Sequence, residues 1–343
     1  MAERGRTKQA TMRDVARLAG VSTATVSFAI NNNPRVSPTL RARVMAAIEQ
    51  TGYAPDAAAR TLRRGVAPSL GLIISDITNP NFATIALAVE RAAQARGYGV
   101  FICNTDEKLE DERNYLRLMR AQRVAGLLLA TSGRDDAAHA ARLAAEVAMP
   151  VVLIDRPMSG LDWDSVVTDN VGAAHAAVAH LVALGHRRIG YVGGLPHLVL
   201  ADQRLEGYRR ALAEGGIAFD PALVRQGNYR PHEAAASTRA LLAGADRPSA
   251  IFGTNAITIL GVMQGIAELG LAVPAEISVV GVDDVPWATV VRPGLTTVVQ
   301  PSAEVGALAV EMLLDRIADP GRPPRHEVLP TNLVVRGSAA PLA

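Results

Sequence analysis

The chain has 343 residues, more than one ordinary domain holds, so its length predicts two or three domains with sizeable cores. Charged residues make up 20% of it and no run of 18 uncharged apolar residues occurs, so we expect no membrane span. The single cysteine, Cys103, excludes a disulfide framework, and its apolar neighbours predict a buried thiol in a reducing cytoplasm. The first basic residues are not followed by an apolar segment, so no secretory signal is expected.

The charge is distributed unevenly along the chain. Residues 1–64 contain eleven Arg or Lys and four acidic residues, a net charge of +7, whereas the remainder carries −5. A basic head on an acidic body favours a polyanionic partner for the head alone, with a merely solvated basic surface as the alternative.

Three short helical patterns follow one another in the head. Thr11 and Asp14 form the pattern of a capping box, and Val15, Leu18 and Ala19 are spaced for one helical face. Ser22 is placed to cap a second helix over 23–30, and Ser37 to cap a third that ends at Gly52. The glycine-containing turn between the first two helices is typical of a helix-turn-helix.

The stretch 56–64, written DAAARTLRR, predicts a further helix of about two turns, followed by a linker that contains Gly65 and Pro68. A helix this short is marginal on its own in water, so we expect a hinge that folds conditionally.

From residue 70 onward, apolar runs of four to six residues alternate with alanine-rich helical stretches, a pattern that predicts parallel sheets covered on both faces. The expected strands are 70–75, 100–104, 126–130, 151–155, 165–168, 189–192, 250–254, 278–282 and 296–299.

Polar residues follow several of these strands directly. Because ligands bind beyond the carboxyl ends of parallel strands, these positions predict a ligand site, although a single such residue is more often a helix cap. They are Asp76, Asn104, Asp155, Asp169, Asn255 and Asp283.

Enzyme motifs are missing from the sequence. It has no GxGxxG triplet, GxxxxGK loop, GxSxG elbow or HExxH pair, and His175 and His180 are five residues apart, which does not place both on one helical face as metal ligands. We therefore expect a binding protein without cofactor or metal.

The head sequence TMRDVARLAGVSTATVSFAINNNPRVSPTLRARVMAAIEQTGYAPDAAARTLRRG resembles the head and hinge of the lactose/galactose repressor (LacI/GalR) family. Further along, LGHRRIGYVGG, QRLEGYRRAL, ISVVGVDD and PGLTTVVQP resemble the same family's periplasmic-binding-protein-like body. The resemblance implies a fold with three parts: an all-α three-helix helix-turn-helix domain at 1–54, a hinge helix and linker at 55–69, and an α/β body of two Rossmann-like subdomains at 70–343. The N-subdomain would comprise about 70–169 plus 300–328, and the C-subdomain about 170–299 plus 329–343.

By this resemblance the second helix enters the DNA major groove. Thr23, Ala24 and Phe28 would face the bases, and the alternative for Phe28 is packing inside the head. Relatives often have long polar side chains there, whereas Ala24 and Phe28 offer apolar contact, for instance to thymine methyl groups. The other expected DNA-binding residues are Thr11, Ser22, Thr25, Ser27 and Asn31 in the head and Arg60, Leu62 and Arg63 in the hinge, where Leu62 would enter the minor groove.

The family's effector lies between the two subdomains. Arg204 and Asp283 match the expected clamping pair, Phe82 after NPN would flank the ligand, and Asn255 matches a cleft asparagine followed here by Ala256. The apolar loop at 198–200 and Ala256 put a highly polar sugar in doubt and favour a partly apolar glycoside or nucleoside. The full expected set is Asp76, Phe82, Asp155, Leu198, Leu200, Arg204, Asn255 and Asp283.

The resemblance implies a cytoplasmic, nucleoid-associated repressor that binds double-stranded operator DNA as a homodimer under the control of a small-molecule effector. We expect a dimer because the residues after Val335 are too few for a tetramer-forming helix. The main alternative is a DNA-independent solute-binding protein of the periplasmic type, which would not use a basic head, and an enzyme on an α/β scaffold is the third.

Overall fold

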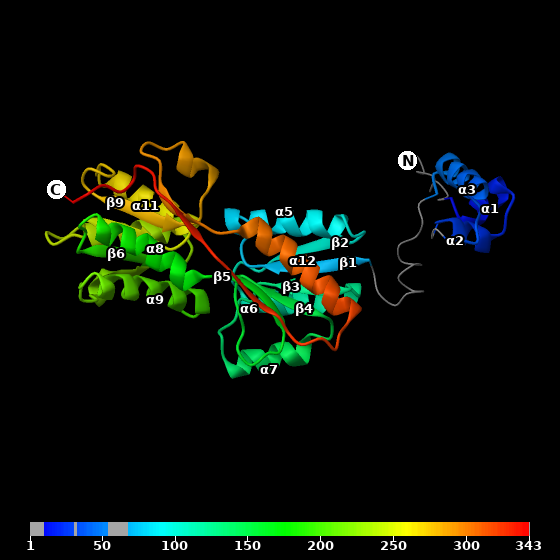
Figure 1. Cartoon of the computed structure of the whole chain (residues 1–343), viewed down its shortest axis with the longest axis horizontal. Helices are drawn as coiled ribbons and strands as arrows, with labels where there is room; N and C mark the ends of the chain where they lie inside the picture. Colours follow the sequence, from blue (N-terminus) through cyan, green and yellow to red (C-terminus); the bar gives the residue numbers. More distant parts are fainter. Residues whose placement is uncertain (1–9, 31–32, 54–67, 343) are drawn as a thin grey trace, which may run out of the picture. The chain divides into compact units, whose positions relative to one another are not determined.

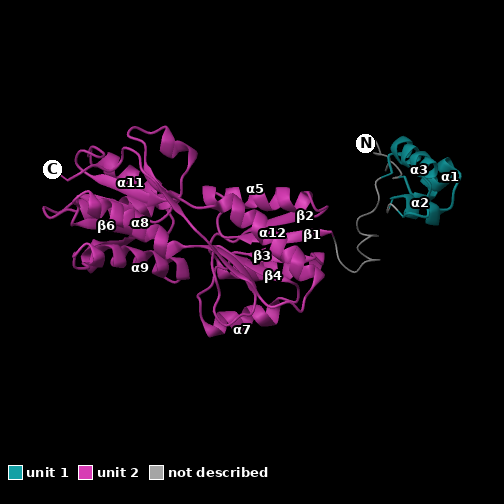
Figure 2. Cartoon of the chain, viewed as in Figure 1, with its two compact units in different colours: residues 1–67 teal, residues 68–343 magenta. Residues whose placement is uncertain are grey.

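The computed structural model describes residues 10–30, 33–53 and 68–342, and the chain divides into two compact units, 1–67 and 68–343 (Figures 1 and 2). The expected hinge helix, with Arg60, Leu62 and Arg63, lies outside the described residues, as does Asn31.

Three helices make up the described part of the first unit: α1 (Met12–Ala19), α2 (Thr23–Ile30) and α3 (Pro38–Thr51). The Asp14 carboxylate accepts hydrogen bonds from the Thr11 backbone N–H at 3.0 Å and from its hydroxyl at 2.6 Å. The Ser22 hydroxyl accepts from the Thr25 N–H, and Ser37 caps α3. The predicted helix-turn-helix is therefore confirmed: α2 and α3 each begin at a serine whose hydroxyl accepts from one free backbone N–H, and at α1 the Asp14 carboxylate accepts from the Thr11 N–H.

The small core of this unit contains Val15, Ala16 and Ala19 of α1, together with Val26 of α2 and Val44 of α3. The prediction that Leu18 shares the inner face was wrong, because its side chain is 52% exposed. The buried face of α1 is formed by Val15, Ala16 and Ala19, so Ala16 takes an inner position and Leu18 lies outside that face.

The described residues of the second unit form two six-stranded sheets, each at the centre of one lobe. In the first lobe the order is β11-β5-β4-β3-β1-β2, all parallel, and in the second it is β12-β10-β9-β8-β6-β7, where only β12 is antiparallel. The first-lobe strands are β1 (Ser69–Ile74), β2 (Gly99–Asn104), β3 (Gly126–Leu129), β4 (Val151–Ile154), β5 (Asp164–Thr168) and β11 (His326–Leu329). The second-lobe strands are β6 (Ile189–Gly193), β7 (Val224–Gln226), β8 (Ala250–Gly253), β9 (Ser278–Val282), β10 (Thr296–Val299) and β12 (Asn332–Val334).

Helices cover both faces of each sheet (Figure 1). In the first lobe, α5 (Pro80–Gln94) and α12 (Ser302–Ala318) pack side by side on one face, and α6 (Leu109–Gln122) and α7 (Ala137–Glu146) cover the other. In the second lobe, α8 (Asn170–Ala183) packs with α9 (Val199–Glu214), and α10 (Pro231–Leu242) packs with α11 (Ala256–Glu268). The second lobe also contains two short 3-10 helices, η1 (Pro221–Leu223) and η2 (Pro286–Thr289).

The chain passes between the lobes after β5, after β10 and after β11. Each lobe is therefore built from separate parts of the sequence. All nine predicted strands are confirmed. The sequence did not predict β7, β11 and β12, because these three short strands contain exposed or half-exposed polar residues and no continuous apolar run.

Helices α8 and α9 meet at Gly207, whose missing side chain allows the contact. A Cβ at this position would lie 2.2 Å from the Val171 carbonyl oxygen, a backbone atom that cannot turn aside. We therefore expect Gly207→Ala to separate the two helices and to lower the free energy of unfolding by about 1–3 kcal/mol, measured by denaturant or thermal unfolding. Gly99→Ala is the matched control, since a Cβ there meets nothing within 4 Å. Equal stability of the two variants would contradict this account of the α8–α9 contact.

Candidate functional site

A cavity lies between the two lobes and receives side chains from both. Its walls are mainly charged and amide side chains, with one tyrosine, one phenylalanine and one leucine. They are Asp76, Asn79, Asn81, Phe82, Asp106, Glu107, Asp155, Arg156, Leu200, Arg204, Asn228, Tyr229, Arg230, Asn255, Asp283 and Gln300.

The cavity lies where the strands of both sheets end, as the sequence analysis expected. Of the six polar residues that follow predicted strands, Asp76, Asp155, Asn255 and Asp283 line it. The other two have local roles: the Asn104 side chain accepts a hydrogen bond from the Ile77 N–H, and Asp169 caps α8 through the Gly172 N–H.

Left-handed backbone conformations are concentrated at this cavity. Among the described non-glycine residues with positive φ, all but Arg123 line it. Asp and Asn tolerate this conformation, but Glu107 at φ 60° and Tyr229 at φ 55° adopt it at a cost of roughly 1–3 kcal/mol each. Strain of this kind persists where surrounding contacts fix the backbone, and it is typical of binding sites.

The floor of the first lobe is organised by the buried guanidinium of Arg156. It donates to both Glu107 carboxylate oxygens at 2.6 and 2.7 Å, to the Thr131 carbonyl at 2.8 Å and to the Ser75 hydroxyl at 3.2 Å. Burial disfavours its charge, but the Glu107 carboxylate outweighs this effect and raises the pKa of Arg156. The bidentate pair thus keeps a full charge stable in a dry site.

Asp155 lies beside Arg156 with fewer partners. Its carboxylate is 3.4 Å from the Arg156 Nε, and no hydrogen bond to it is found within the described part of the chain. Burial raises the pKa of Asp155, although the Arg156 and Arg204 charges act in the opposite direction. A buried carboxylate with free acceptor capacity is suited to receive hydroxyl or amine hydrogens from a ligand.

Arg204 extends from α9 to the other side of the cavity, and its side chain is buried. Its Nε donates to the Asn170 Oδ1 at 2.9 Å and its Nη1 to the Thr254 carbonyl at 2.7 Å. Both acceptors are uncharged, and no ion pair between Arg204 and Asp283 is found among the described residues. The guanidinium is therefore fixed in place while its second Nη remains available for a ligand.

The Asp283 carboxylate accepts from the Ala256 N–H at 3.0 Å and from the Gln300 Nε2 at 2.5 Å. The Gln300 Oε1 in turn accepts from the Thr168 hydroxyl at 2.7 Å. Thr168 and Gln300 belong to two of the segments that cross between the lobes, so this wall of the cavity is hydrogen-bonded to the crossovers.

Tyr229 and Leu200 form an apolar wall of the cavity, and Leu198 packs against both. The buried hydroxyl of Tyr229 has no hydrogen-bond partner within the described structure, and burial raises the pKa of Tyr229 to about 12, so the phenol stays protonated at neutral pH. The expectation that Leu198 lines the cavity was wrong: its side chain is fully buried and packs behind Leu200 and Tyr229. The loop turns into α9 here, and alternate positions face opposite ways.

The remaining expected residues also line the cavity. Asp76 is engaged by Thr78 in a local turn, Phe82 lies mostly within the first-lobe core, and the Asn255 Oδ1 caps α11 by accepting from the Thr258 N–H. The Asn255 Oδ1 is thus engaged at the start of α11.

Sequence reasoning missed about half of the lining residues. Arg156 directly follows Asp155, and Asp106 and Glu107 come two and three residues after Asn104, so extending each strand end by three residues would have found them. Asn228, Tyr229 and Arg230 follow β7, the strand without an apolar run. For these three the sequence carried no comparable signal.

Asp155 and Asp164 provide a pair of tests with opposite signs. Because burial raises the Asp155 pKa, its ionised form lowers stability, and Asp155→Asn should stabilise the chain at neutral pH. The gain should shrink as the pH falls through the raised pKa, since the protonated carboxyl avoids the penalty.

Burial also opposes ionisation of Asp164, but hydrogen bonds from Arg316 and the Arg325 N–H outweigh it and lower its pKa. Asp164→Asn should therefore destabilise the chain at neutral pH, and the loss should shrink at acidic pH below the ordinary aspartate pKa. Thermal unfolding across a pH series measures both variants. If both substitutions stabilised the chain, or if neither did, the opposite pKa shifts assigned to Asp155 and Asp164 would be refuted.

The DNA-binding candidates of the first unit lie at the start of α2 and along its outer side. Thr23 and Ala24 are exposed, Phe28 is 44% exposed, and Thr25 and Ser27 are half-buried. Phe28 is thus not a core residue, which removes the alternative of packing inside the head. Ser22 and Thr11 are occupied as helix caps but remain exposed.

Other kinds of site find no support within the described ranges. There, no group of three or more His, Cys, Asp or Glu is arranged to hold a metal ion. Cys103 is buried, as predicted. In the same ranges no helix has both the length and the apolar character needed to span a bilayer.

Two family models match the chain. Residues 11–56 match bacterial regulatory proteins of the lacI family, and residues 178–339 match a periplasmic binding protein-like domain. The sequence is 35% identical over 310 residues to the HTH-type transcriptional repressor PurR of Aliivibrio salmonicida, covering 90% of this chain and 93% of that protein. It is 34% identical to the ribose operon repressor of Haemophilus influenzae, covering 96% and 98%.

Solved structures of transcription regulators also match the chain. The structure of the Lac repressor dimer bound to operator and an anti-inducer matches with a TM-score of 0.87 at 30% identity, covering 97% of this chain and 100% of that one. A complex of the transcriptional regulator CelR with cellobiose matches with a TM-score of 0.72 at 31% identity, covering 96% and 100%.

Proposed function

The chain belongs to the lacI family of bacterial regulatory proteins, and from this premise we propose that it represses transcription by binding a palindromic operator as a homodimer. A small molecule in the cavity between the lobes controls its affinity for DNA. The chain is a transcription regulator and not an enzyme. We assign the protein to the cytoplasm, in association with the nucleoid, where its operator lies.

The observation that carries this proposal is the combination of an exposed recognition face with a sensing cavity in one chain. Thr23 and Ala24 project from the N-terminal end of α2, where side chains of a recognition helix meet base edges, and Phe28 is exposed one turn further along the same helix. A methyl and a phenyl group recognise thymine methyl groups rather than hydrogen-bonding edges. Ser22, Thr25 and Ser27, with Thr11 and Asn31, are assigned to phosphate contacts around it.

The hinge residues complete the DNA contact in this proposal. Leu62 enters the minor groove at the operator centre and partly unstacks a base step, while Arg60 and Arg63 contact the backbone. Their proposed role follows from the family resemblance, since they lie outside the described residues.

The effector is proposed to bind to Asp76, Phe82, Asp155, Leu200, Arg204, Asn255 and Asp283, with Tyr229 as an added wall. Arg204 and Asn255 offer donors, Asp155 offers acceptors, and Leu200 and Tyr229 form an apolar surface. This combination suits a ligand with hydroxyl groups on one side and an apolar ring on the other, such as a glycoside or a nucleoside. Among relatives, one is named a ribose operon repressor, and one solved structure contains cellobiose.

Linkage connects the two sites. A ligand that binds more tightly to the chain at one angle between the lobes shifts the population toward that angle. The dimer transmits the shift to the hinge and the DNA-binding heads.

Phe28→Ala tests base reading by an apolar side chain. We expect operator affinity to fall at least about fivefold with unchanged thermal stability, because a half-exposed ring contributes little to the core and its contact with thymine methyl groups is lost. Fluorescence anisotropy with operator duplex at fixed salt measures the affinity. Met45→Ala, which removes an exposed side chain from α3, is the control. Unchanged affinity of the Phe28 variant would exclude its role, and failure of the wild type to bind any duplex from its own promoter region would exclude the repressor assignment.

Calorimetry with a panel of sugars, glycosides and nucleosides, repeated in the presence of operator, tests the cavity and the sign of the control. Arg204→Met should abolish binding of whichever compound binds, because it removes the fixed donor. Arg209→Met, on the exposed side of the same helix, should leave binding unchanged. Equal loss in both variants would move the effector site elsewhere.

A further inference from the structure

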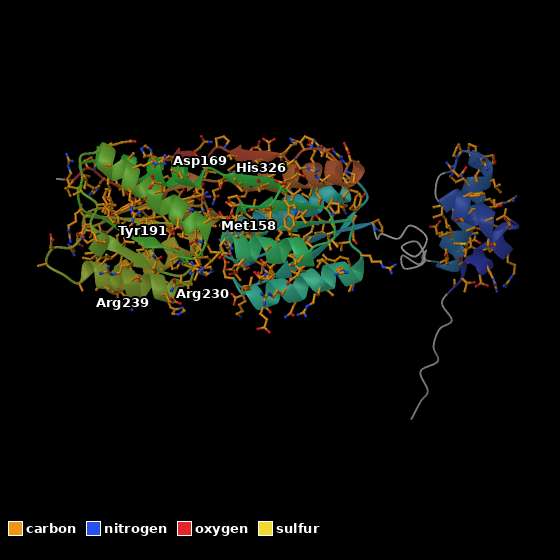
Figure 3. All side chains as sticks on the ribbon, turned by 90° about the horizontal axis from the view of Figure 1, so that it is seen from below. Met158, Asp169, Tyr191, Arg230, Arg239 and His326 are labelled. Atoms are coloured by element: carbon orange, nitrogen blue, oxygen red, sulfur yellow. The ribbon has the colours of Figure 1, made fainter. Side chains whose placement is uncertain are left out.

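One ion pair joins the two lobes across the mouth of the cavity. An Arg230 Nη of the second lobe donates to the Asp106 Oδ1 of the first at 2.7 Å. Every other ion pair found in the described part of the second unit stays within one lobe. Figure 3 shows Arg230, the residue directly before α10, where the lobes meet, whereas Arg239 on α10 lies farther from the junction.

The loops that carry the pair are held firmly in their own lobes. Asp106 and Glu107 are consecutive left-handed residues, and the Glu107 carboxylate is anchored on the buried Arg156. On the other side, Asn228 and Tyr229 are also consecutive left-handed residues, and the Asn228 Nδ2 donates to Glu233. Two strained, anchored loops therefore present opposite charges to each other, so the ion pair forms at one lobe angle and breaks when the lobes rotate apart.

The environment of the pair lets it form and break. The Asp106 side chain is 37% exposed and that of Arg230 is 39% exposed, so neither charge suffers full desolvation when the pair separates. Hydrogen bonds from Arg230 and Lys108 lower the pKa of Asp106, which keeps the carboxylate charged at neutral pH. Lys108 belongs to the same lobe as Asp106 and pairs with it at 3.0 Å.

We propose that Asp106 and Arg230 form an electrostatic latch that favours the closed lobe angle and thereby positions both walls of the cavity before an effector binds. The latch rests on the proposed function only in that the cavity receives the effector. By stabilising the closed form it raises the fraction of chains in which the walls contributed by Arg156 and Arg204 face each other. An exposed ion pair of this kind changes the ratio of closed to open molecules about two- to fivefold.

The experiment measures the lobe angle in the full-length, ligand-free chain, so that its outcome does not depend on identifying an effector. In a Cys103→Ser background, Ala121→Cys on α6 and Ala240→Cys on α10 place spin labels at exposed positions in the two lobes. Distance distributions are recorded by pulsed electron paramagnetic resonance, with excess unlabelled chain to suppress distances between subunits. Circular dichroism confirms that each variant folds.

Asp106→Asn and Arg230→Gln should each broaden the distribution toward longer distances and lower the closed-to-open ratio about two- to fivefold. Asparagine retains the tolerance for positive φ at 106. The double variant should open no further than either single variant, since both remove the same contact. Lys108→Gln is the matched control, because it removes the other cation bound to Asp106 without touching the second lobe.

Distributions in Asp106→Asn and Arg230→Gln that match the wild type would overturn the latch. So would fully additive effects in the double variant, or equal opening in Lys108→Gln, because either result would assign the change to local charge rather than to the contact between lobes. Failure to find an effector by calorimetry, with the distance changes as expected, would refute the proposed ligand site and leave the latch standing.

Discussion

The buried guanidinium of Arg156 is the interaction on which the cavity depends. It contacts groups that follow four different strands: Ser75 after β1, Glu107 after β2, Thr131 after β3 and Asp155 directly before it after β4. Because a buried charge that loses its partner is costly, these four strand ends are held in a single arrangement. Within this arrangement Glu107 and Asp155 adopt left-handed backbone conformations.

The second lobe uses a different arrangement with a similar result. Arg204 is fixed by neutral acceptors, and Asp283 reaches the crossover segments through Gln300 and Thr168. Side chains that line the cavity thus also bond to the segments about which the lobes move. This gives a physical route by which occupancy of the cavity affects the lobe angle, since a ligand that draws on Arg204 or Asp283 competes with bonds that fix the crossovers.

Most of the fold could be predicted from the sequence because its elements carry strong local signals. Ser22 and Ser37 cap helices where the sequence placed caps, and the core strands are continuous apolar runs that only a sheet covered on both faces can bury. The signal failed where tertiary packing decides: Leu18 is exposed because Ala16 takes the inner position, and Leu198 is buried behind Tyr229. The site was harder to predict than the fold. Residues at strand ends could be found from the pattern, but Asp106 and Arg230 are charged loop residues whose sequence neighbourhood resembles any solvated surface, and only their three-dimensional positions bring them together across the cavity.

The three crossovers also impose an order on the synthesis of the chain. Strands β1 to β5 leave the ribosome early, but α12, which covers the face that includes Leu72 and Val152, begins 134 residues after β5 ends. At about 5–20 residues per second, that face waits on the order of 10–30 s for its cover. During this interval the nascent first lobe exposes an apolar sheet surface to the cell, while most of the second lobe is completed behind it. Chaperone binding to the growing chain is therefore expected to concentrate on the first lobe.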